Sequence, residues 1–272
     1  MKFKVLVLDI DGTLNNSKKE VSPKTKKAIT TAINNGVTVV LASGRPTCGV
    51  MPVAKEIGLD KLGGYILSFN GGRITNCKTG EIIYEKVIPQ SDIPEIYNLS
   101  KEFGVNILTY SDNNIICENS DEFLEIECKI NKVKCKTVDS LIDYIKHDVP
   151  KFLMLGDGKY LEKIEPVVCK RLDNRFNAFR SEPFFLEIMP KNIDKAYSLG
   201  KLLEHLGLSK DEMIACGDGF NDVSMIEYAG LGVAMENAQP AVKAASNYIT
   251  LSNDNDGIAH VIEKFIMDEQ SA

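Results

Sequence analysis

The sequence predicts an α/β protein in which a doubly wound parallel sheet is interrupted by an inserted α+β domain. Near both ends of the chain, continuous apolar runs alternate with amphipathic segments, which is the pattern of β-α-β units around a buried parallel sheet. In the middle of the chain the apolar runs are shorter and come in adjacent pairs, which is typical of an antiparallel sheet.

The first of these regions supplies the clearest elements. Ser22 is a suitable N-cap, Pro23 suits the first helical turn, and Gly36 suits the end of the same helix. Each apolar run ends in polar residues and glycines, as strands of a parallel sheet do where they meet a ligand. We expect strands over 3–10, 37–44 and 63–72, and helices over 22–36 and 46–59.

The middle of the chain, from about residue 85 to 186, predicts an antiparallel sheet covered by helices on one face. We expect helices over 91–104, 120–131, 140–147 and 159–172, and strands over 105–110, 114–118, 151–156, 175–181 and 184–189.

From about residue 190 to residue 272, apolar strands again alternate with amphipathic helices. We expect helices over 192–208, 221–230, 239–247 and 257–269, and strands over 212–219, 231–235 and 248–251. The sequence therefore predicts a Rossmann-like core of residues 1–84 and 187–272, with residues 85–186 inserted as a separate α+β domain.

Composition excludes several classes of protein. Of 272 residues, 44% are hydrophobic and 26% charged, which is ordinary for a globular chain. A net charge of −6 argues against nucleic acid or an anionic membrane as the main partner, and no apolar run approaches the roughly 20 residues of a membrane span. The seven cysteines form no C-x-x-C pair and the three histidines show no metal-ligand spacing. We expect reduced thiols and a cytoplasmic location.

Polar residues stand just past the predicted strands, at the edge where doubly wound sheets bind ligands. These residues are Asp9, Asp11, Ser43, Gly44, Arg45, Asn70, Gly71, Gly217, Asp218, Asn221 and Asp222, and Lys195 opens a helix upstream of the last group. Carboxylates brought together there would repel one another unless a cation lies between them. Mg²⁺ prefers such oxygen ligands and is commonly shared with a phosphate. Hydroxyl, backbone N–H and lysine donors complement phosphate oxygens, so the set predicts phosphoryl chemistry.

An aspartate is the best candidate nucleophile. No G-x-S-x-G elbow and no G-x-x-x-x-G-K-[ST] loop occurs in the chain. An aspartate can attack phosphorus and form an aspartyl-phosphate, while a second carboxyl protonates the leaving alcohol and then deprotonates water. Asp9 and Asp11, at i and i+2 before Gly12, suit this division of labour.

These residues also carry a resemblance to a known family. "DIDGTL" resembles the D-x-D-G-T-L signature of haloacid dehalogenase (HAD) superfamily phosphatases, and "LASGR", "NIDKAYSL" and "GDGFND" resemble its three further motifs in the same order. The insertion, "FNGG" and "EIMPK" resemble the Cof-like (IIB) sugar-phosphate phosphatases, which carry a C2-type cap domain. One departure is Asn192, where that subgroup often has glycine.

The resemblance implies a role for each matched residue. Asp9 would be the nucleophile and a Mg²⁺ ligand, Asp11 the general acid/base with its carbonyl also on the metal, and Asp218 the third protein ligand. Ser43 and Lys195 would hold the transferring phosphoryl group, Asn221 would help to position it, and Asp222 would orient Lys195 or a metal-bound water. Gly44, Arg45 and Asn70 are further candidates for contact with the substrate.

Simpler structural readings stand beside several of these roles. Ser43 and Gly44 could form an ordinary turn, and Asn70 with Gly71 another. Arg45 could be a surface arginine, and Asp222 could cap the helix that follows it, which is compatible with catalysis.

The sequence thus predicts a Mg²⁺-dependent phosphatase that hydrolyses a small phosphorylated metabolite, with a hexose or pentose phosphate the leading substrate. Pyridoxal phosphate, a flavin-precursor phosphate or a nucleotide fit the same chemistry. A phosphomutase and a non-catalytic sugar-phosphate-binding regulator are the alternative functions. We expect neither a nucleic-acid nor a membrane partner, and a monomer or a weak homodimer.

Overall fold

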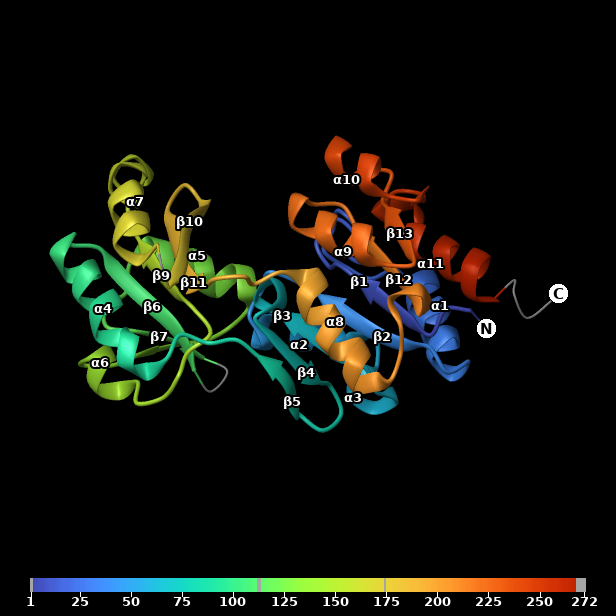
Figure 1. Cartoon of the computed structure of the whole chain (residues 1–272), viewed down its shortest axis with the longest axis horizontal. Coiled ribbons are helices and arrows are strands. Elements are labelled where there is room, and N and C mark those ends of the chain that lie inside the picture. The colour runs from blue at the N-terminus through green and yellow to red at the C-terminus, as the bar shows by residue number, and fades with distance from the viewer. Residues whose placement is uncertain (1, 112–113, 174, 268–272) are drawn as a thin grey trace. The chain divides into compact units, whose positions relative to one another are not determined.

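The computed structural model describes residues 2–111, 114–173 and 175–267. It divides into two compact units, the first formed by Met1–Tyr84 and Asp194–Ala272 and the second by Glu85–Ile193 (Figure 1). The predicted α/β fold class is confirmed, because the first unit is built on a largely parallel sheet with helices between its strands. Among the described residues, every helix is too short or too polar to cross a lipid bilayer.

The sheet of the first unit has the strand order β14-β13-β12-β1-β2-β3-β4-β5. Strand β1 is central and pairs in parallel on both sides, Val5 with Thr38 of β2 and with Met213 of β12. The strands are β1 (Val5–Leu8), β2 (Thr38–Ala42), β3 (Tyr65–Ser68), β4 (Arg73–Asn76), β5 (Ile82–Glu85), β12 (Met213–Gly217), β13 (Leu231–Ala234) and β14 (Tyr248–Ile249). The chain runs outward from β1 in one direction and from β12 in the other, so their carboxyl ends meet at a topological switch point.

Helices join these strands, and α1 begins at the capping residue that the sequence predicts. In α1, Ser22 accepts a hydrogen bond from the Thr25 backbone N–H at 3.0 Å and Pro23 stands in the first turn. The helices are α1 (Pro23–Asn34), α2 (Thr47–Glu56), α3 (Leu59–Leu62), α8 (Lys195–Leu206), α9 (Val223–Tyr228), α10 (Pro240–Ala245) and α11 (Gly257–Ile262). A π-helical turn, Glu263–Met267, continues α11. The remainder of the helix predicted over 257–269 lies outside the described residues.

Two edge strands of this sheet were not predicted. Strand β4 pairs antiparallel with β3, with Tyr65 opposite Asn76, and β5 extends the edge beyond it. The single strand predicted over 63–72 instead ends at Ser68, because the chain turns back through a 3₁₀ turn at Phe69–Gly71. The parallel prediction therefore holds from β14 to β3 and fails at this edge, where a short turn permits antiparallel pairing.

The second unit has its own sheet, in the order β10-β11-β9-β6-β7-β8. Its strands are β6 (Asn106–Ser111), β7 (Asn114–Cys117), β8 (Cys135–Thr137), β9 (Phe152–Leu155), β10 (Phe176–Glu182) and β11 (Phe185–Pro190). Strand β8 was not predicted, and it pairs with β7 in parallel, unlike the other described pairs. The reason is the helix between them, since a crossover connection is what parallel neighbours require.

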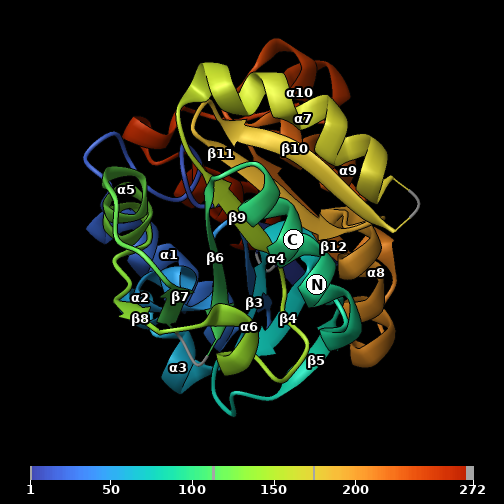
Figure 2. The ribbon, with the colours of Figure 1, turned by 90° about the vertical axis from the view of Figure 1, so that its left-hand side faces the viewer.

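The helices of the second unit are α4 (Ile93–Glu102), α5 (Glu122–Asn131), α6 (Leu141–Tyr144) and α7 (Gly158–Leu172). Side chains of α4, α6 and α7 share one buried core with one face of the sheet, including Ile96, Leu141, Leu161, Phe152 and Ile188. Figure 2, which faces this unit, shows α4 and α7 in front of the strands. The predicted cover of helices on one face is therefore present for α4, α6 and α7, whereas α5 contributes no residue to this core.

The division between the units falls later than the boundary expected between residues 186 and 187. Strand β11 pairs with both β9 and β10, so residues up to Ile193 group with the second unit. Asn192 adopts the left-handed conformation, with φ 56°, just before α8. Asparagine and glycine both tolerate that conformation, which accounts for asparagine at a position where glycine was expected.

Candidate active site

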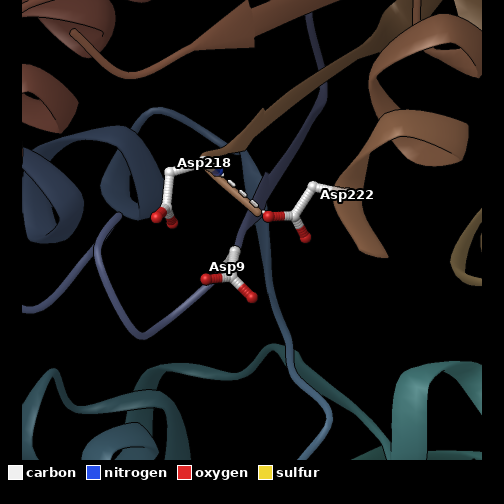
Figure 3. A group of neighbouring side chains, drawn as sticks. All are labelled: Asp9, Asp218 and Asp222. Carbon is white, nitrogen blue, oxygen red and sulfur yellow. Dashed lines mark hydrogen bonds between the residues drawn. The ribbon is translucent and has the colours of Figure 1, made fainter. Parts of the chain in front are cut away.

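Three carboxylates converge at the switch point of the first unit (Figure 3). Asp9 directly follows β1, and Asp218 and Asp222 follow β12. One oxygen of each lies within 4.8 Å of the others. The carboxyl ends of two central strands thus bring together side chains from the two ends of the chain, as their sequence positions predict.

Lys195 lies at the centre of this cluster and is 1% exposed. Its Nζ donates to Asp9 Oδ1 at 2.9 Å, to Asp222 Oδ1 at 2.6 Å and to the Ala42 carbonyl at 2.9 Å. All three ammonium protons therefore have acceptors, which is what a buried lysine requires. Asp194 holds this geometry by capping α8, because its Oδ1 accepts from the Tyr197 backbone N–H and Lys195 becomes the first helical residue.

Burial and repulsion set the titration of this cluster. Burial raises the pKa of Asp9 well above its ordinary value, and the Asp222 carboxylate raises it further, although Lys195 opposes both. Burial alone would lower the pKa of Lys195, but the Asp9 and Asp222 carboxylates outweigh it and raise that pKa. One buried cation among three carboxylates leaves an excess of negative charge.

Both oxygens of Asp222 accept hydrogen bonds from the protein. Its Oδ1 accepts from Lys195, and its Oδ2 accepts from the backbone N–H groups of Asp218 at 3.0 Å and Gly219 at 2.9 Å. This side chain thus orients the lysine and closes the turn after β12. The lysine-orienting role agrees with these contacts. The predicted capping of the following helix is wrong, because the Asp222 side chain makes no capping hydrogen bond to α9 and instead accepts from the two N–H groups that precede it.

Asp218 faces the loop after β1. Its Oδ1 accepts from the Thr13 hydroxyl at 2.7 Å. Gly12 gives its Oδ2 room, because a Cβ at that position would lie 2.3 Å from this oxygen, and the φ of 85° is one that glycine adopts freely. Burial raises the pKa of Asp218, and Asp222 adds to the rise against the Thr13 hydrogen bond.

The donor set suits a hard divalent cation. Within the described residues, no hydrogen-bond donor contacts Asp9 Oδ2 or Asp218 Oδ2. Both oxygens belong to carboxylates whose pKa values are raised, so each anion is incompletely neutralised by the protein. Oxygen ligands with unbalanced negative charge are what Mg²⁺ and Ca²⁺ select. Asp9 and Asp218 could therefore hold a metal ion, whereas both oxygens of Asp222 already accept hydrogen bonds from other described residues.

Asp11 lies apart from the carboxylate cluster and is bound by arginine. Arg45 Nε donates to Asp11 Oδ2 at 2.8 Å, and Arg45 Nη2 donates to Asp11 Oδ1 at 2.7 Å. The Lys19 ammonium lies 3.2 Å from Asp11 Oδ1. That Arg45 contacts a phosphate stays a prediction, and the structure adds a bidentate partner that sequence reasoning did not assign to it.

Ser43, Gly44, Asn70 and Asn221 form a group that is linked by direct contacts. Ser43 is 3% exposed, and its hydroxyl accepts from the Arg45 backbone N–H at 3.2 Å. Asn221 Nδ2 donates to Asn70 Oδ1 at 3.0 Å. The amide of Asn70 lies over Gly44, where a Cβ would come within 3.1 Å of Asn70 Nδ2. These predicted phosphate-side residues therefore contact one another directly.

Sequence reasoning missed three contributors. Thr13 stands inside the quoted "DIDGTL" but received no role. Asn237 donates to the Gly12 carbonyl at 2.8 Å and so fixes the loop after β1. Asn237 lies three residues after β13, so its position just past a strand is the signal that could have identified it. The Ala42 carbonyl, which accepts from Lys195, carries no side-chain signal.

A family model described as haloacid dehalogenase-like hydrolase matches residues 6–262. Two curated relatives come from Bacillus subtilis (strain 168). YxeH, which carries a provisional phosphatase name, is 32% identical over 97% of this chain and 99% of its own. The 5-amino-6-(5-phospho-D-ribitylamino)uracil phosphatase YcsE is 29% identical over 97% of this chain and 96% of its own.

Solved structures show the same similarity. A haloacid dehalogenase-like hydrolase from Bacteroides thetaiotaomicron superposes with a TM-score of 0.93 and 46% identity, covering 97% of this chain and all (100%) of that one. The HAD subclass IIB sugar phosphatase BT4131 superposes with a TM-score of 0.76 and 25% identity, covering 96% of this chain and 98% of that one.

Proposed function

Because the chain belongs to the haloacid dehalogenase-like hydrolase family and is a phosphatase, we propose that it hydrolyses a sugar phosphate through an aspartyl-phosphate formed on Asp9. One observation carries the proposal. The Asp9 carboxylate is buried at the switch point, with Lys195 Nζ 2.9 Å from one of its oxygens and Asp218 beside it. A binding protein would gain nothing from so costly a buried anion.

In the first step, the Asp9 carboxylate attacks phosphorus, a P–O bond to Asp9 forms, and the P–O bond to the sugar breaks. Lys195 holds the attacking carboxylate in place and offsets charge that develops on the phosphoryl oxygens. The Ser43 hydroxyl and the Asn221 amide donate hydrogen bonds to the same oxygens. Position and electrostatics thus do most of the work, as phosphoryl transfer requires.

Asp11 moves the protons. It donates one to the departing sugar oxygen and later takes one from the water that attacks the aspartyl-phosphate. That second attack breaks the bond to Asp9 and releases inorganic phosphate. Arg45, which makes two hydrogen bonds to Asp11, stabilises its ionised form after the first step.

We propose Mg²⁺ as the metal, held by Asp9, Asp218 and the Asp11 carbonyl. When bound, this ion would neutralise charge on the nucleophile and the phosphoryl group. The incompletely neutralised oxygens of Asp9 and Asp218 support the assignment.

The substrate class rests on the relatives. BT4131 is named a sugar phosphatase, and YcsE acts on a phosphorylated ribityl compound. The substrates that these two names describe are both phosphate monoesters on a polyhydroxylated carbon chain. We further propose that the second unit serves as a cap that excludes bulk water and selects the substrate, which its insertion into the catalytic unit supports.

Turnover of p-nitrophenyl phosphate with and without Mg²⁺ tests the reaction. We expect hydrolysis that requires the metal and disappears in Asp9→Asn, and wild-type protein no more active than this variant would refute the proposal. A panel of hexose, pentose and ribityl phosphates, with pyridoxal phosphate and nucleotides, then tests the substrate through kcat/KM. Release of free phosphate in proportion to substrate consumed separates hydrolysis from a phosphomutase, which interconverts isomers and releases little.

A further inference from the structure

The turn Phe69–Gly71 has an unusual backbone. Phe69 and Asn70 both have φ 54°, and Gly71 has φ 107°. Residues with a Cβ rarely adopt the left-handed region, and two in succession are rarer still. Such a conformation persists only where surrounding contacts hold it, and it concentrates at functional sites.

The backbone of this turn binds the loop after β2. The Asn70 N–H donates to the Ser43 carbonyl at 3.0 Å, and the Phe69 N–H donates to the Arg45 carbonyl at 3.0 Å. The Ser43 N–H in turn donates to the Leu67 carbonyl at 2.8 Å. The left-handed turn is what directs two successive N–H groups toward the loop that carries Ser43.

The other side of the turn contacts the start of α8. The Ser198 hydroxyl donates to the Gly71 carbonyl at 2.6 Å. A Cβ on Gly71 would lie 2.6 Å from the Asp194 carbonyl, so only glycine permits this approach. The same turn therefore adjoins the helix that begins with Lys195.

The Asn70 side chain reaches the third element of the site. Its Oδ1 accepts from Asn221 Nδ2 at 3.0 Å, and its amide packs on Gly44. When Asn221 gives one amide proton to Asn70, its amide plane is fixed and its second proton has a defined direction. Asn70 thus connects the loop of Ser43 with the turn of Asn221.

We propose that Asn70 is a positioning residue, which sets the separation and orientation of Ser43 and Asn221 so that both can bind one phosphoryl group. The proposal rests on the phosphatase function proposed above, since it assigns Ser43 and Asn221 to the phosphate. It gives Asn70 an indirect role in place of direct contact with the substrate. The left-handed backbone and the amide are both required for this role, because one holds Ser43 and the other holds Asn221.

Asn70→Gly is the decisive variant. Glycine adopts φ 54° without strain, so the backbone contacts to Ser43 persist and the melting temperature should equal or exceed that of the wild type. The bond to Asn221 is lost. We expect the dissociation constant for inorganic phosphate, measured by calorimetry with Mg²⁺ present, to rise about tenfold, which corresponds to one hydrogen bond.

Lys132→Gly is the matched control. Lys132 also has φ 54°, but it ends α5 in the second unit. This variant should relieve the same backbone strain and leave phosphate affinity unchanged. Unaltered phosphate affinity in Asn70→Gly would overturn the proposal, and so would an equal loss in Lys132→Gly.

A double-mutant cycle with Asn221→Ala tests the route of the effect. If Asn70 acts through Asn221, Asn70→Gly should weaken phosphate binding in the wild type and change it less than twofold in Asn221→Ala. Additive losses would contradict the proposal. Calorimetry and turnover together separate the positioning role of Asn70 from the phosphatase function. If phosphate binding depends on Asn70 but the protein shows no turnover, the phosphatase function is refuted and the positioning role is kept. If Asn70→Gly shows normal turnover and unchanged phosphate affinity, the positioning role is refuted and the phosphatase function is kept.

Discussion

Arg45 binds the Asp11 carboxylate through two hydrogen bonds, from Nε to Oδ2 at 2.8 Å and from Nη2 to Oδ1 at 2.7 Å. A planar guanidinium that meets both oxygens fixes the plane of the carboxyl group as well as its place. Arg45 therefore holds the proposed general acid/base, Asp11, in a fixed orientation, although the two residues lie on different loops.

Arg45→Ala should impair substrates according to their leaving group. An alkoxide needs a proton as it departs, whereas p-nitrophenolate does not, so a misplaced Asp11 should slow alkyl phosphates more. We expect kcat/KM to fall about 100-fold for a sugar phosphate and about tenfold or less for p-nitrophenyl phosphate. Lys19→Ala removes only an exposed contact at 3.2 Å and should change neither value appreciably. Equal losses on both substrates in Arg45→Ala would contradict this role.

Asp218→Asn and Asp222→Asn should shift stability in opposite directions when metal is removed with EDTA. Asparagine at 218 keeps an acceptor for Thr13 and removes a repelling charge, so the melting temperature should rise by about 2 °C. Asparagine at 222 must turn its NH₂ group toward either Lys195 or two backbone N–H groups, which should cost about 2–4 kcal/mol.

The same pair of variants distinguishes a residue that binds the metal, Asp218, from a residue that only orients Lys195, Asp222. Calorimetric titration with Mg²⁺ should show affinity lost in Asp218→Asn and largely kept in folded Asp222→Asn. Comparable losses would mean that Asp222 is itself a ligand.

Lys195→Met should destabilise the protein by about 3–5 kcal/mol, because it leaves Asp9 and Asp222 buried without their cation. The pKa of Lys195 is raised in the folded state, so its contribution to the free energy of unfolding is complete below the ordinary lysine pKa of 10.5. That contribution is lost as the pH rises through the raised folded value. Denaturant melts of both proteins from pH 7 to 11 should show a constant difference that narrows only at the alkaline end, and narrowing near neutral pH would contradict the ion pairs.

Glu118→Gln probes the second unit. Burial alone would raise the pKa of Glu118, but hydrogen bonds from Lys101, the Leu141 backbone N–H and Tyr97 outweigh it and lower that pKa. We expect a loss of about 1–2 kcal/mol at pH 7. Because the folded pKa is depressed, the stabilisation is present above the ordinary value of 4.5 and fades as the pH falls through the folded value.

The control for that experiment is Glu102→Gln, which breaks an exposed pair with Arg171 and should change stability little at any pH. A Glu118→Gln difference that persists unchanged to pH 3 would show that shape, rather than charge, is lost.

Strand-end positions were the most predictable part of this site. Asp9 and Asp218 follow apolar runs that belong to a buried parallel sheet, so their convergence follows from topology. The antiparallel edge strands β4 and β5 were missed, because both are short, three of the four residues of β4 are polar, and the two ends of β5 are exposed. Periodicity is weak in segments so short.

Side-chain pairings were not predictable in the same way. Nothing local to Arg45 indicates that its guanidinium meets Asp11, since their contact depends on how two loops leave neighbouring strands. The left-handed conformation of Asn70 likewise depends on contacts between this turn and residues far away in the sequence. The Asn70 N–H donates to the Ser43 carbonyl, and the Ser198 hydroxyl on α8 donates to the Gly71 carbonyl. Such features arise from packing between segments, which sequence patterns do not record.

The central place of β1 also has a consequence for biosynthesis. Val5 pairs with Thr38 early in the chain but with Met213 only after the whole second unit has been made. Glu85–Ile193 has a core of its own, so it can fold on the ribosome while one edge of β1 still lacks a partner. Until β12 emerges, Asp9 lacks Asp218, and we expect the nascent enzyme to be inert. Activity thus requires segments that are made before and after the second unit.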